Sequence, residues 1–194
     1  MRLTLLAPAV LALALSGCFG GGGPPQLLTL SASEARPVAA PRTAGAGEAI
    51  TVAVPAVPQA LRTTRIPVYV SETSIQYLTD AAWVESPGGL FARLLGETIA
   101  AKTGRVVLDP AQYSADPGTR LTGTLVKCGL DPNTMEVVIV YDAVISRGAA
   151  GVGTNRFESR VSVAEATPAA VAPALNQAAN QLAAQVAAWI GSPS

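Results

Sequence analysis

The stretch "TRLTGTLVKCGLDPNTMEVVIVYDAVIS", residues 119–146, decides the fold, because it holds two long runs of strand-forming residues separated by a turn. The first run, residues 119–131, alternates apolar and polar positions, and the second, residues 133–146, is rich in Val and Ile. Asp131, Pro132 and Asn133 between them are residues typical of turns. The stretch therefore predicts an antiparallel strand pair.

Downstream of this pair, "RFESRVSVAE" at residues 156–165 alternates strictly between two kinds of residue. Phe157, Ser159, Val161 and Val163 share one side, and Arg156, Glu158, Arg160 and Ser162 share the other. An alternation of period two indicates a strand that is half buried. We expect one face of this strand to be exposed to water.

Shorter strand signals lie upstream of the pair. They occupy residues 27–30, 50–54, 67–70, 74–78 and 105–109, and the piece at 74–78 is typical of an edge strand. Prolines stand at positions 55, 58 and 67. Because proline removes a hydrogen bond from the strand ladder, these three are expected at strand ends or edges.

Two segments carry the apolar spacing of amphipathic helices. In "ESPGGLFARLLGETIAAKTG", apolar residues at 90, 91, 94, 95 and 99 share one face. Ser86 is the expected cap, Pro87 fits the first turn and Gly104 fits the stop. From about residue 168 to 190, apolar residues recur at 171, 175, 178, 182, 186 and 190. Thr167 is its candidate cap, and Pro173 is expected to kink this helix or to mark its true first turn.

The N-terminus has the pattern of a bacterial lipoprotein signal. Met1 and Arg2 precede an apolar run at residues 3–15, which is too short for a permanent transmembrane helix. The residues that follow, "LSGC" at 15–18, resemble the lipobox, at which the cysteine sulfur receives a diacylglycerol. We therefore predict a signal peptide at residues 1–17 and lipidation of Cys18. The alternative is a conventional signal peptide that leaves Cys18 as an ordinary residue.

The residues after Cys18, "FGGGGPPQ", disfavour regular structure because they combine glycine and proline. We predict a lipid-anchored flexible tether at residues 18–26 and a single domain at 27–194. Phe19 stands where enterobacterial sorting would use an aspartate to retain a lipoprotein in the inner membrane. This favours the outer membrane, with the domain facing the periplasm.

Composition excludes several classes of function. The chain carries 13 Lys and Arg, 13 Asp and Glu, and no His, so histidine-based catalysis and His-ligated zinc are excluded. The basic residues are scattered, so no nucleic-acid partner is indicated. With Cys18 acylated, Cys128 has no disulfide partner in the chain; a buried unreactive thiol is favoured, with a reactive thiol or an intermolecular bridge as the alternative. No cofactor is indicated. The acidic residues also show no spacing that demands a shared catalytic or metal site; they are Asp80, Glu85, Asp109, Asp116 and Asp142.

The order of segments resembles the ABC-type transport auxiliary lipoprotein family. A lipobox cysteine is followed by "LLTL", by "ITVAVPAVPQALRTTRIPVYV" and by "SIQYLTDAAWVESPGGLFARLLGETI". This reproduces a valine-rich strand ending in proline, a segment of Leu and basic residues, and a Tyr before a Trp, with a helix opening just after the Trp. The resemblance covers about residues 27–190.

The resemblance implies an α/β (α+β) fold with a mixed, largely antiparallel sheet and two main helices packed on one face. It implies no catalytic activity. The expected partners are an MCE-domain protein and the permease and ATPase of an ABC transporter for lipids, which members accompany at the outer membrane as docking or capping parts. Some members assemble as rings, so a homo-oligomer is a further expectation.

A partner-facing edge is expected around residues 61–70. Arg62 and Arg65 are candidate contacts, and Tyr77 and Trp83 are candidate aromatic anchors of the kind enriched at interfaces. Simple solvation of the two arginines and core packing of Trp83 are the alternatives. A second candidate function is a periplasmic carrier that holds acyl chains in an apolar groove between sheet and helices.

Overall fold

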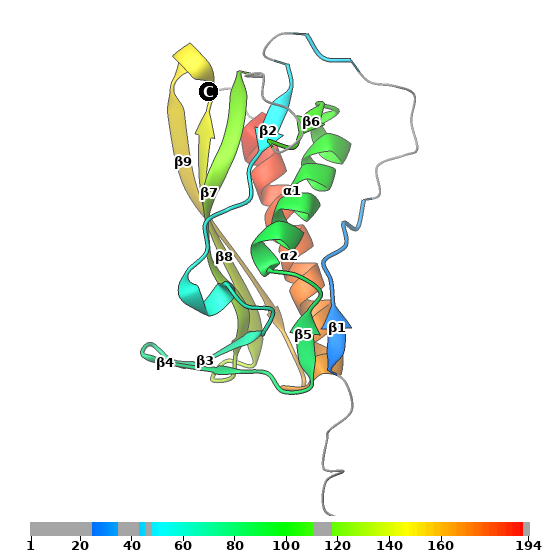
Figure 1. Cartoon of the computed structure of the whole chain (residues 1–194), viewed down its shortest axis with the longest axis vertical. Coiled ribbons are helices and arrows are strands. Elements are labelled where there is room, and N and C mark those ends of the chain that lie inside the picture. The colour runs from blue at the N-terminus through cyan, green and yellow to red at the C-terminus, as the bar shows by residue number, and fades with distance from the viewer. Residues whose placement is uncertain (1–24, 35–42, 46–47, 111–117, 192–194) are drawn as a thin grey trace, which may run out of the picture.

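The computed structural model describes residues 25–34, 43–45, 48–110 and 118–191 (Figure 1). The segment predicted as a strand pair forms β7 (Thr119–Asp131) and β8 (Glu136–Ser146), which pair in antiparallel fashion. The turn between them is closed by the Asn133 amide, which donates to Asp131 Oδ1 at 3.0 Å. Next along the chain, β9 (Val152–Ser162) pairs antiparallel with β8.

The predicted faces of the third long strand are confirmed. Phe157 and Ser159 of β9, and Val163 just after it, are buried, and Val161 is half buried. Arg156, Glu158 and Arg160 are exposed. The exposed charges form ion pairs with the neighbouring strand, since Arg156 contacts Asp142 and Arg160 contacts Glu136.

The five predicted short strands are present; four are shorter than predicted, and the one that begins at Pro67 is one residue longer. A sixth, at residues 81–83, was not predicted. The six are β1 (Gln26–Leu28), β2 (Ile50–Val52), β3 (Pro67–Ser71), β4 (Ser74–Tyr77), β5 (Ala81–Trp83) and β6 (Val107–Leu108). Pro67 opens β3, whereas Pro55 and Pro58 lie outside the strands, as expected from their missing donors. A 3-10 turn, η1 (Gln59–Leu61), precedes β3, and another, η2 (Gly148–Ala150), joins β8 to β9.

The expectation of a largely antiparallel sheet is wrong. Of the seven strand pairings among the described residues, four are parallel and three are antiparallel. The sheet is nevertheless mixed: β8 lies along one edge of β7, while β2 and β3 share its other edge, near its start and its end respectively. Parallel neighbours need a crossover rather than a hairpin, and the chain from β2 to β6 supplies one that contains a helix.

Both predicted helices are confirmed. They are α1 (Pro87–Thr103) and α2 (Pro168–Gly191). Gly104 ends α1 in the left-handed conformation with φ 69°, as glycine readily does. Ser86 is the N-cap residue of α1, although its side chain makes no capping hydrogen bond. The Thr167 carbonyl accepts the first bonds of α2, and Pro173 lies inside that helix rather than in its first turn.

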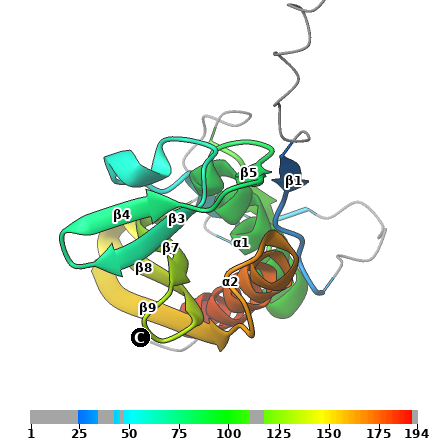
Figure 2. The same ribbon diagram turned by 90° about the horizontal axis from the view of Figure 1, so that it is seen from below.

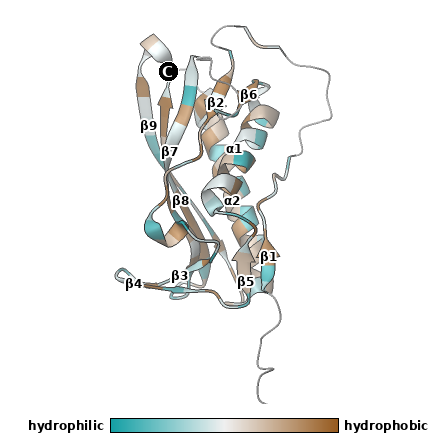
Figure 3. Cartoon of the chain, viewed as in Figure 1, coloured by the Kyte–Doolittle hydropathy of each residue, from teal (hydrophilic) through white to brown (hydrophobic). Residues whose placement is uncertain are grey.

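The helices cover one face of the sheet (Figures 1 and 2), with α2 against β8 and β9 and α1 against α2. Apolar residues, brown in Figure 3, occur on both the helices and the strands. Between these layers Phe91 of α1 packs edge-on against Tyr141 of β8 at 5.3 Å between ring centroids. No helix in the described ranges is both long and apolar enough to cross a membrane.

At the end of β7, β3 approaches that strand closely as its parallel neighbour in the sheet. A Cβ atom at Gly129 would lie 2.2 Å from the Pro67 carbonyl oxygen, so this close approach requires a glycine there. The Tyr69 ring lies over the same glycine, and its hydroxyl accepts a hydrogen bond from the Cys128 amide at 3.1 Å. This contact attaches the β3–β4 hairpin to the long strands.

Candidate partner-binding surfaces

The predicted partner-facing edge is formed by η1, the loop after it and the β3–β4 hairpin. β4 is the outermost strand on this side of the sheet, and Figure 1 shows the hairpin projecting from the body. In the antiparallel pair, Pro67 lies opposite Tyr77 and Tyr69 opposite Ile75. Because side chains alternate along a strand, these four share one face of the hairpin.

Two of the predicted residues meet on this face. The Arg65 guanidinium lies over the Tyr77 ring at 3.9 Å from its centroid, and the Tyr77 hydroxyl donates to the Ala60 carbonyl at 3.4 Å. The stacking of a guanidinium on an aromatic face orients both side chains. Tyr77 is therefore fixed between the loop and η1.

Arg62 and Ile75 extend this surface. Arg62 directly follows η1, is exposed, and forms no ion pair within the described part of the chain. Ile75 is 45% exposed and adds an apolar side chain to this surface. We call the set Arg62, Arg65, Ile75 and Tyr77 the β4-edge surface.

Trp83 lies in the hydrophobic core rather than on that surface. Its side chain is 2% exposed, and its indole nitrogen has no hydrogen-bond partner among the described residues. Its backbone amide donates to the Thr64 carbonyl at 2.7 Å. Trp83 thus supports, from beneath, the loop that carries Arg62 and Arg65.

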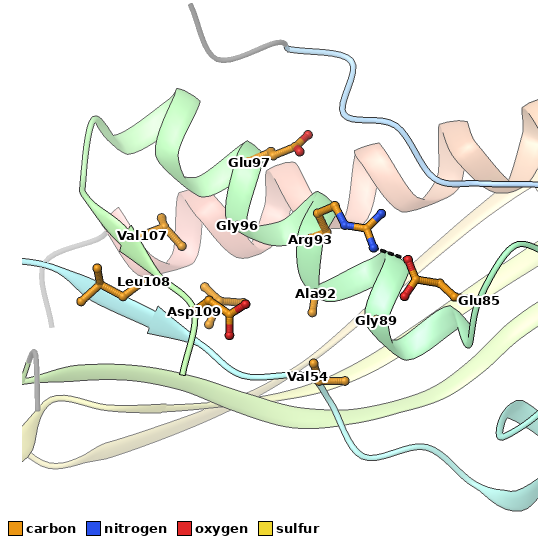
Figure 4. A pocket seen from close by; sticks show the side chains of 11 residues that line it. Val54, Glu85, Gly89, Ala92, Arg93, Gly96, Glu97, Val107, Leu108 and Asp109 are labelled. Atoms are coloured by element: carbon orange, nitrogen blue, oxygen red, sulfur yellow. Dashed lines mark hydrogen bonds and ion pairs between the residues drawn. The ribbon is translucent and has the colours of Figure 1, made fainter. Parts of the chain in front are cut away.

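A second surface feature is a groove of about 670 Å³ between α1 and the strands β2 and β6 (Figure 4). Ala92 of α1 and Val54 face one another across it, and Val107 and Leu108 extend its apolar wall. Charged side chains line its rim, where Arg93 forms an ion pair with Glu85. Neither the sequence pattern nor the resemblance pointed to this groove. Its lining comes from three separate segments of the chain, and the first and last of these, at Val52 and Asp109, are more than 50 positions apart.

Acidic residues that could serve catalysis are dispersed. Asp142 accepts two hydrogen bonds from Arg156, at 2.5 and 2.6 Å, and these bonds hold the pKa of its carboxyl below its usual value. Asp109 lines the α1 groove, Asp80 lies in the β4–β5 turn, and Asp116 lies outside the described residues. Within the described ranges, no three His, Cys, Asp or Glu side chains are placed to hold a metal ion.

Cys128 is buried in the core, and burial raises the pKa of its thiol to about 12. A thiol with such a pKa is almost fully protonated at neutral pH and is a poor nucleophile. We expect Cys128 to react with a maleimide at least about 100-fold more slowly in the folded protein than in denaturant, as measured by mass spectrometry on the Cys18→Ser variant. Equal rates in both conditions would show that the thiol is accessible.

Comparison with known proteins gives a consistent result for the family. A family model described as "ABC-type transport auxiliary lipoprotein component" matches residues 28–187. No curated protein matches the sequence.

Two crystal structures share the fold. One is of a protein described as uncharacterized, with a TM-score of 0.69 and 13% identity, covering 87% of this chain and 99% of its own. The other is of a protein from Xanthomonas campestris assigned to the family model DUF330, with a TM-score of 0.61 and 16% identity, covering 86% of this chain and 92% of its own. At these identities the likeness shows the fold alone.

Proposed function

Because this chain belongs to the family of ABC-type transport auxiliary lipoprotein components, we propose that it is the lipid-anchored, non-enzymatic part of an MCE-type lipid transport system. In this role it docks or caps the machinery at the outer membrane. Its partners are the MCE-domain protein and the permease and ATPase of the same system. Family membership supports attachment to a membrane; the choice of the outer membrane rests on Phe19, which follows the proposed lipidation site Cys18.

The sequence supports the anchor. Cys18, the signal peptide and most of the tether lie outside the described residues, and the described chain begins at Pro25, just before β1. The tether between Cys18 and β1 has no more than about eight residues. Fully extended, it would reach roughly 26 Å. An acylated Cys18 would therefore hold the domain close to its membrane.

The β4-edge surface is the observation that carries the partner contact. It combines a stacked Arg65 and Tyr77 with an exposed Ile75, and arginine and tyrosine are among the residues that contribute most to binding at interfaces. The edge of β4 also offers backbone groups for pairing with a strand. We propose that this surface contacts another protein of the transport system.

The lipid carrier is less well supported. It needs an apolar groove between the sheet and the helices. The α2 side chains on the sheet side, such as Leu175, Leu182 and Val186, are fully buried by packing. The α1 groove offers an apolar wall, but charged side chains such as Glu85 and Arg93 line it as well. Mass spectrometry of lipids that co-purify with the unacylated domain separates the two functions. A stoichiometric bound lipid would favour the carrier.

The partner contact is tested by photo-crosslinking in cells. A photoreactive residue at Ile75 is expected to cross-link to the MCE-domain protein or the permease, whereas one at the exposed Gln177 on α2 is not. A cross-link from position 75 to a second copy of the chain would instead support a ring and contradict the assignment of this surface to the transporter.

Arg65→Ala is expected to lower the yield of that cross-link about tenfold, because loss of one central interface residue commonly costs 1–2 kcal/mol. Part of the lower yield comes from the lost contact between Arg65 and the partner. The rest comes from the Tyr77 ring, which the Arg65 guanidinium no longer holds in place. Arg93→Ala, which removes an arginine from the rim of the α1 groove, is the matched control and should leave the yield unchanged. Equal cross-link yields for the parent protein and the two variants would show that the Arg65 side chain is solvated and does not contribute to partner binding.

A further inference from the structure

The first described segment of the chain lies against the body of the domain. We call residues 25–34 the strap. Its first part is β1, which pairs in parallel with β5, and the rest runs beside α2 (Figures 1 and 2). The strap is the part of the domain that follows the tether directly.

Backbone hydrogen bonds attach the start of the strap. The Gln26 amide donates to the Asp80 carbonyl at 2.8 Å, and the Val84 amide donates to the Leu28 carbonyl at 2.9 Å. Leu28 is buried in the core cluster, as is Leu30 two residues on. The strap therefore alternates between side chains that enter the core and side chains that face water.

Two asparagines of α2 hold the rest of the strap. Asn176 Oδ1 accepts from the Ser31 amide at 2.8 Å, and Asn180 Oδ1 accepts from the Ser33 amide at 2.7 Å. Asn180 Nδ2 also donates to the Ser31 carbonyl at 2.9 Å. The spacing of four residues along the helix places both side chains on one face, where they bind the strap as a neighbouring strand would.

A final contact joins the strap to α1, since Lys102 forms an ion pair with Glu34 at 2.7 Å. The strap thus touches β5, α2 and α1 in turn. These contacts involve only its own ten or so residues and the surface beneath them, so it can be released as a unit while the long strands stay paired.

The next attachment of the chain lies at the other end of the domain. Thr43, Ala44 and Glu48 lie beside the end of α1, where Arg105 Nε donates to the Glu48 carbonyl at 2.9 Å. In Figure 1 β1 is at the lower end of the long axis and β2 at the upper end. β1 and Thr43 thus mark two described attachments of the chain at opposite ends of the domain.

We infer that the strap orients the domain on its membrane, holding the end that carries β1, β5 and the β3–β4 hairpin towards the lipid. This inference rests on the proposed anchor at Cys18. With the strap in place, the tether joins the domain at Gln26 and keeps that residue within roughly 26 Å of the lipid. With the strap released, the next attachment among the described residues is at Thr43, after about 25 residues and up to roughly 80 Å of chain, at the opposite end.

The orientation has a consequence for the partner. The β4-edge surface lies on the hairpin, at the end that the strap holds towards the membrane (Figure 1). A partner that uses this surface must therefore reach the level of the membrane. Release of the strap would allow the surface to turn away.

The test uses the mature chain, residues 18–194, coupled through Cys18 to a maleimide phospholipid in phosphatidylcholine vesicles. A fluorophore on an unnatural amino acid replaces either Thr79, in the β4–β5 turn, or Ala149, in η2 at the far end. Energy transfer to a labelled lipid reports the distance from the membrane. We expect at least twofold higher transfer from position 79 than from position 149; equal transfer would overturn the inference.

The release variant combines Asn176→Ala, Asn180→Ala, Leu28→Ser and Leu30→Ser, so that it loosens β1 as well as the rest of the strap. We expect it to abolish the difference between the two positions and to raise amide hydrogen exchange at Ser31 and Ser33 at least tenfold. The control, Gln177→Ala with Gln185→Ala, changes two exposed residues of the same helix and should preserve both values. An unchanged difference in the release variant, despite faster exchange, would show that the strap does not set the orientation.

A disulfide provides the converse variant. Leu27 and Ala82 lie opposite one another in the β1–β5 pair, so Leu27→Cys with Ala82→Cys, oxidised before lipid coupling, should lock the strap. Adding this lock to the release variant is expected to restore the difference; failure to do so contradicts the inference. Because the lipid is attached chemically, these outcomes do not depend on acylation in cells, and failure of the anchor proposal remains distinguishable.

Discussion

Cys18→Ser is expected to transfer the protein from the membrane fraction to the soluble fraction of the cell envelope, with at least a roughly 100-fold lower membrane-bound share. Each buried methylene of an acyl chain contributes about 0.8 kcal/mol, so an anchor of several chains is effectively permanent and its loss removes nearly all of the affinity. Fractionation of cells followed by immunoblotting measures the effect. Metabolic labelling with an alkyne fatty acid should label the parent protein and not the variant.

Cys128→Ala is the matched control for that experiment. It removes the other cysteine of the chain, which is buried in the core, and the protein should stay in the membrane fraction. If the Cys18→Ser protein also stays there, another element holds it to the membrane and the lipid anchor is refuted. Separation of inner and outer membranes from the parent strain then tests the expectation based on Phe19.

Gly129→Ala is expected to lower the free energy of unfolding by about 3 kcal/mol, because a new methyl group is forced into a closely packed contact between β3 and β7. The added Cβ would lie 2.2 Å from the Pro67 carbonyl oxygen and 3.1 Å from the Tyr69 ring. β3 must then move away from β7, although it pairs with that strand only at Val68 and Leu130. Urea denaturation of the Cys18→Ser protein measures the loss, and the melting temperature should fall by about 6–12 °C.

Gly191→Ala is the control for the glycine substitution. Nothing lies within 4 Å of a Cβ placed at Gly191, the last residue of α2, so its effect should stay within about 0.5 kcal/mol. A Gly129→Ala protein as stable as the parent would show that β3 does not approach β7 this closely. It would also remove the rigid attachment on which the β4-edge surface depends.

Local patterns predicted the elements well. The predicted bounds of β7 match the structure, although its alternation changes phase at an irregularity between Leu125 and Lys127. The bounds of α1 follow from Pro87 and Gly104, each of which has a backbone reason to stand at a helix end. The period of α2 is regular enough that every predicted apolar position is buried. These features depend on neighbours in the chain, so they are readable without a fold.

The pairing of strands was not readable in the same way. β2 and β3 are short and each is compatible with either direction, so the hairpin of β7 and β8 suggested more antiparallel neighbours than exist. Their parallel placement is set by the path of the chain through α1. The close approach of β3 to β7 at Gly129 also favours this parallel placement. The sequence did not reveal it, because a single glycine in a strand has several possible explanations.

The candidate site was predicted in part. Arg65 and Tyr77 were both predicted as contacts, and the fold brings them together. Trp83 was predicted as an aromatic anchor with core packing as the alternative, and it lies in the core. The role of Asn176 and Asn180 was missed, since on a helical wheel they are only polar residues of an exposed face. Their partner, the strap, is about 145 residues away.

The sequence by itself determined the elements, the family and the expected anchor at Cys18, because each is encoded in contiguous residues whose spacing or chemistry acts locally. The tertiary structure decided which strands are neighbours, which of the chosen aromatics is exposed, and that the segment after the tether is fastened to α2. Those properties depend on contacts between distant parts of the chain, and their free energy exists only when the whole domain is packed.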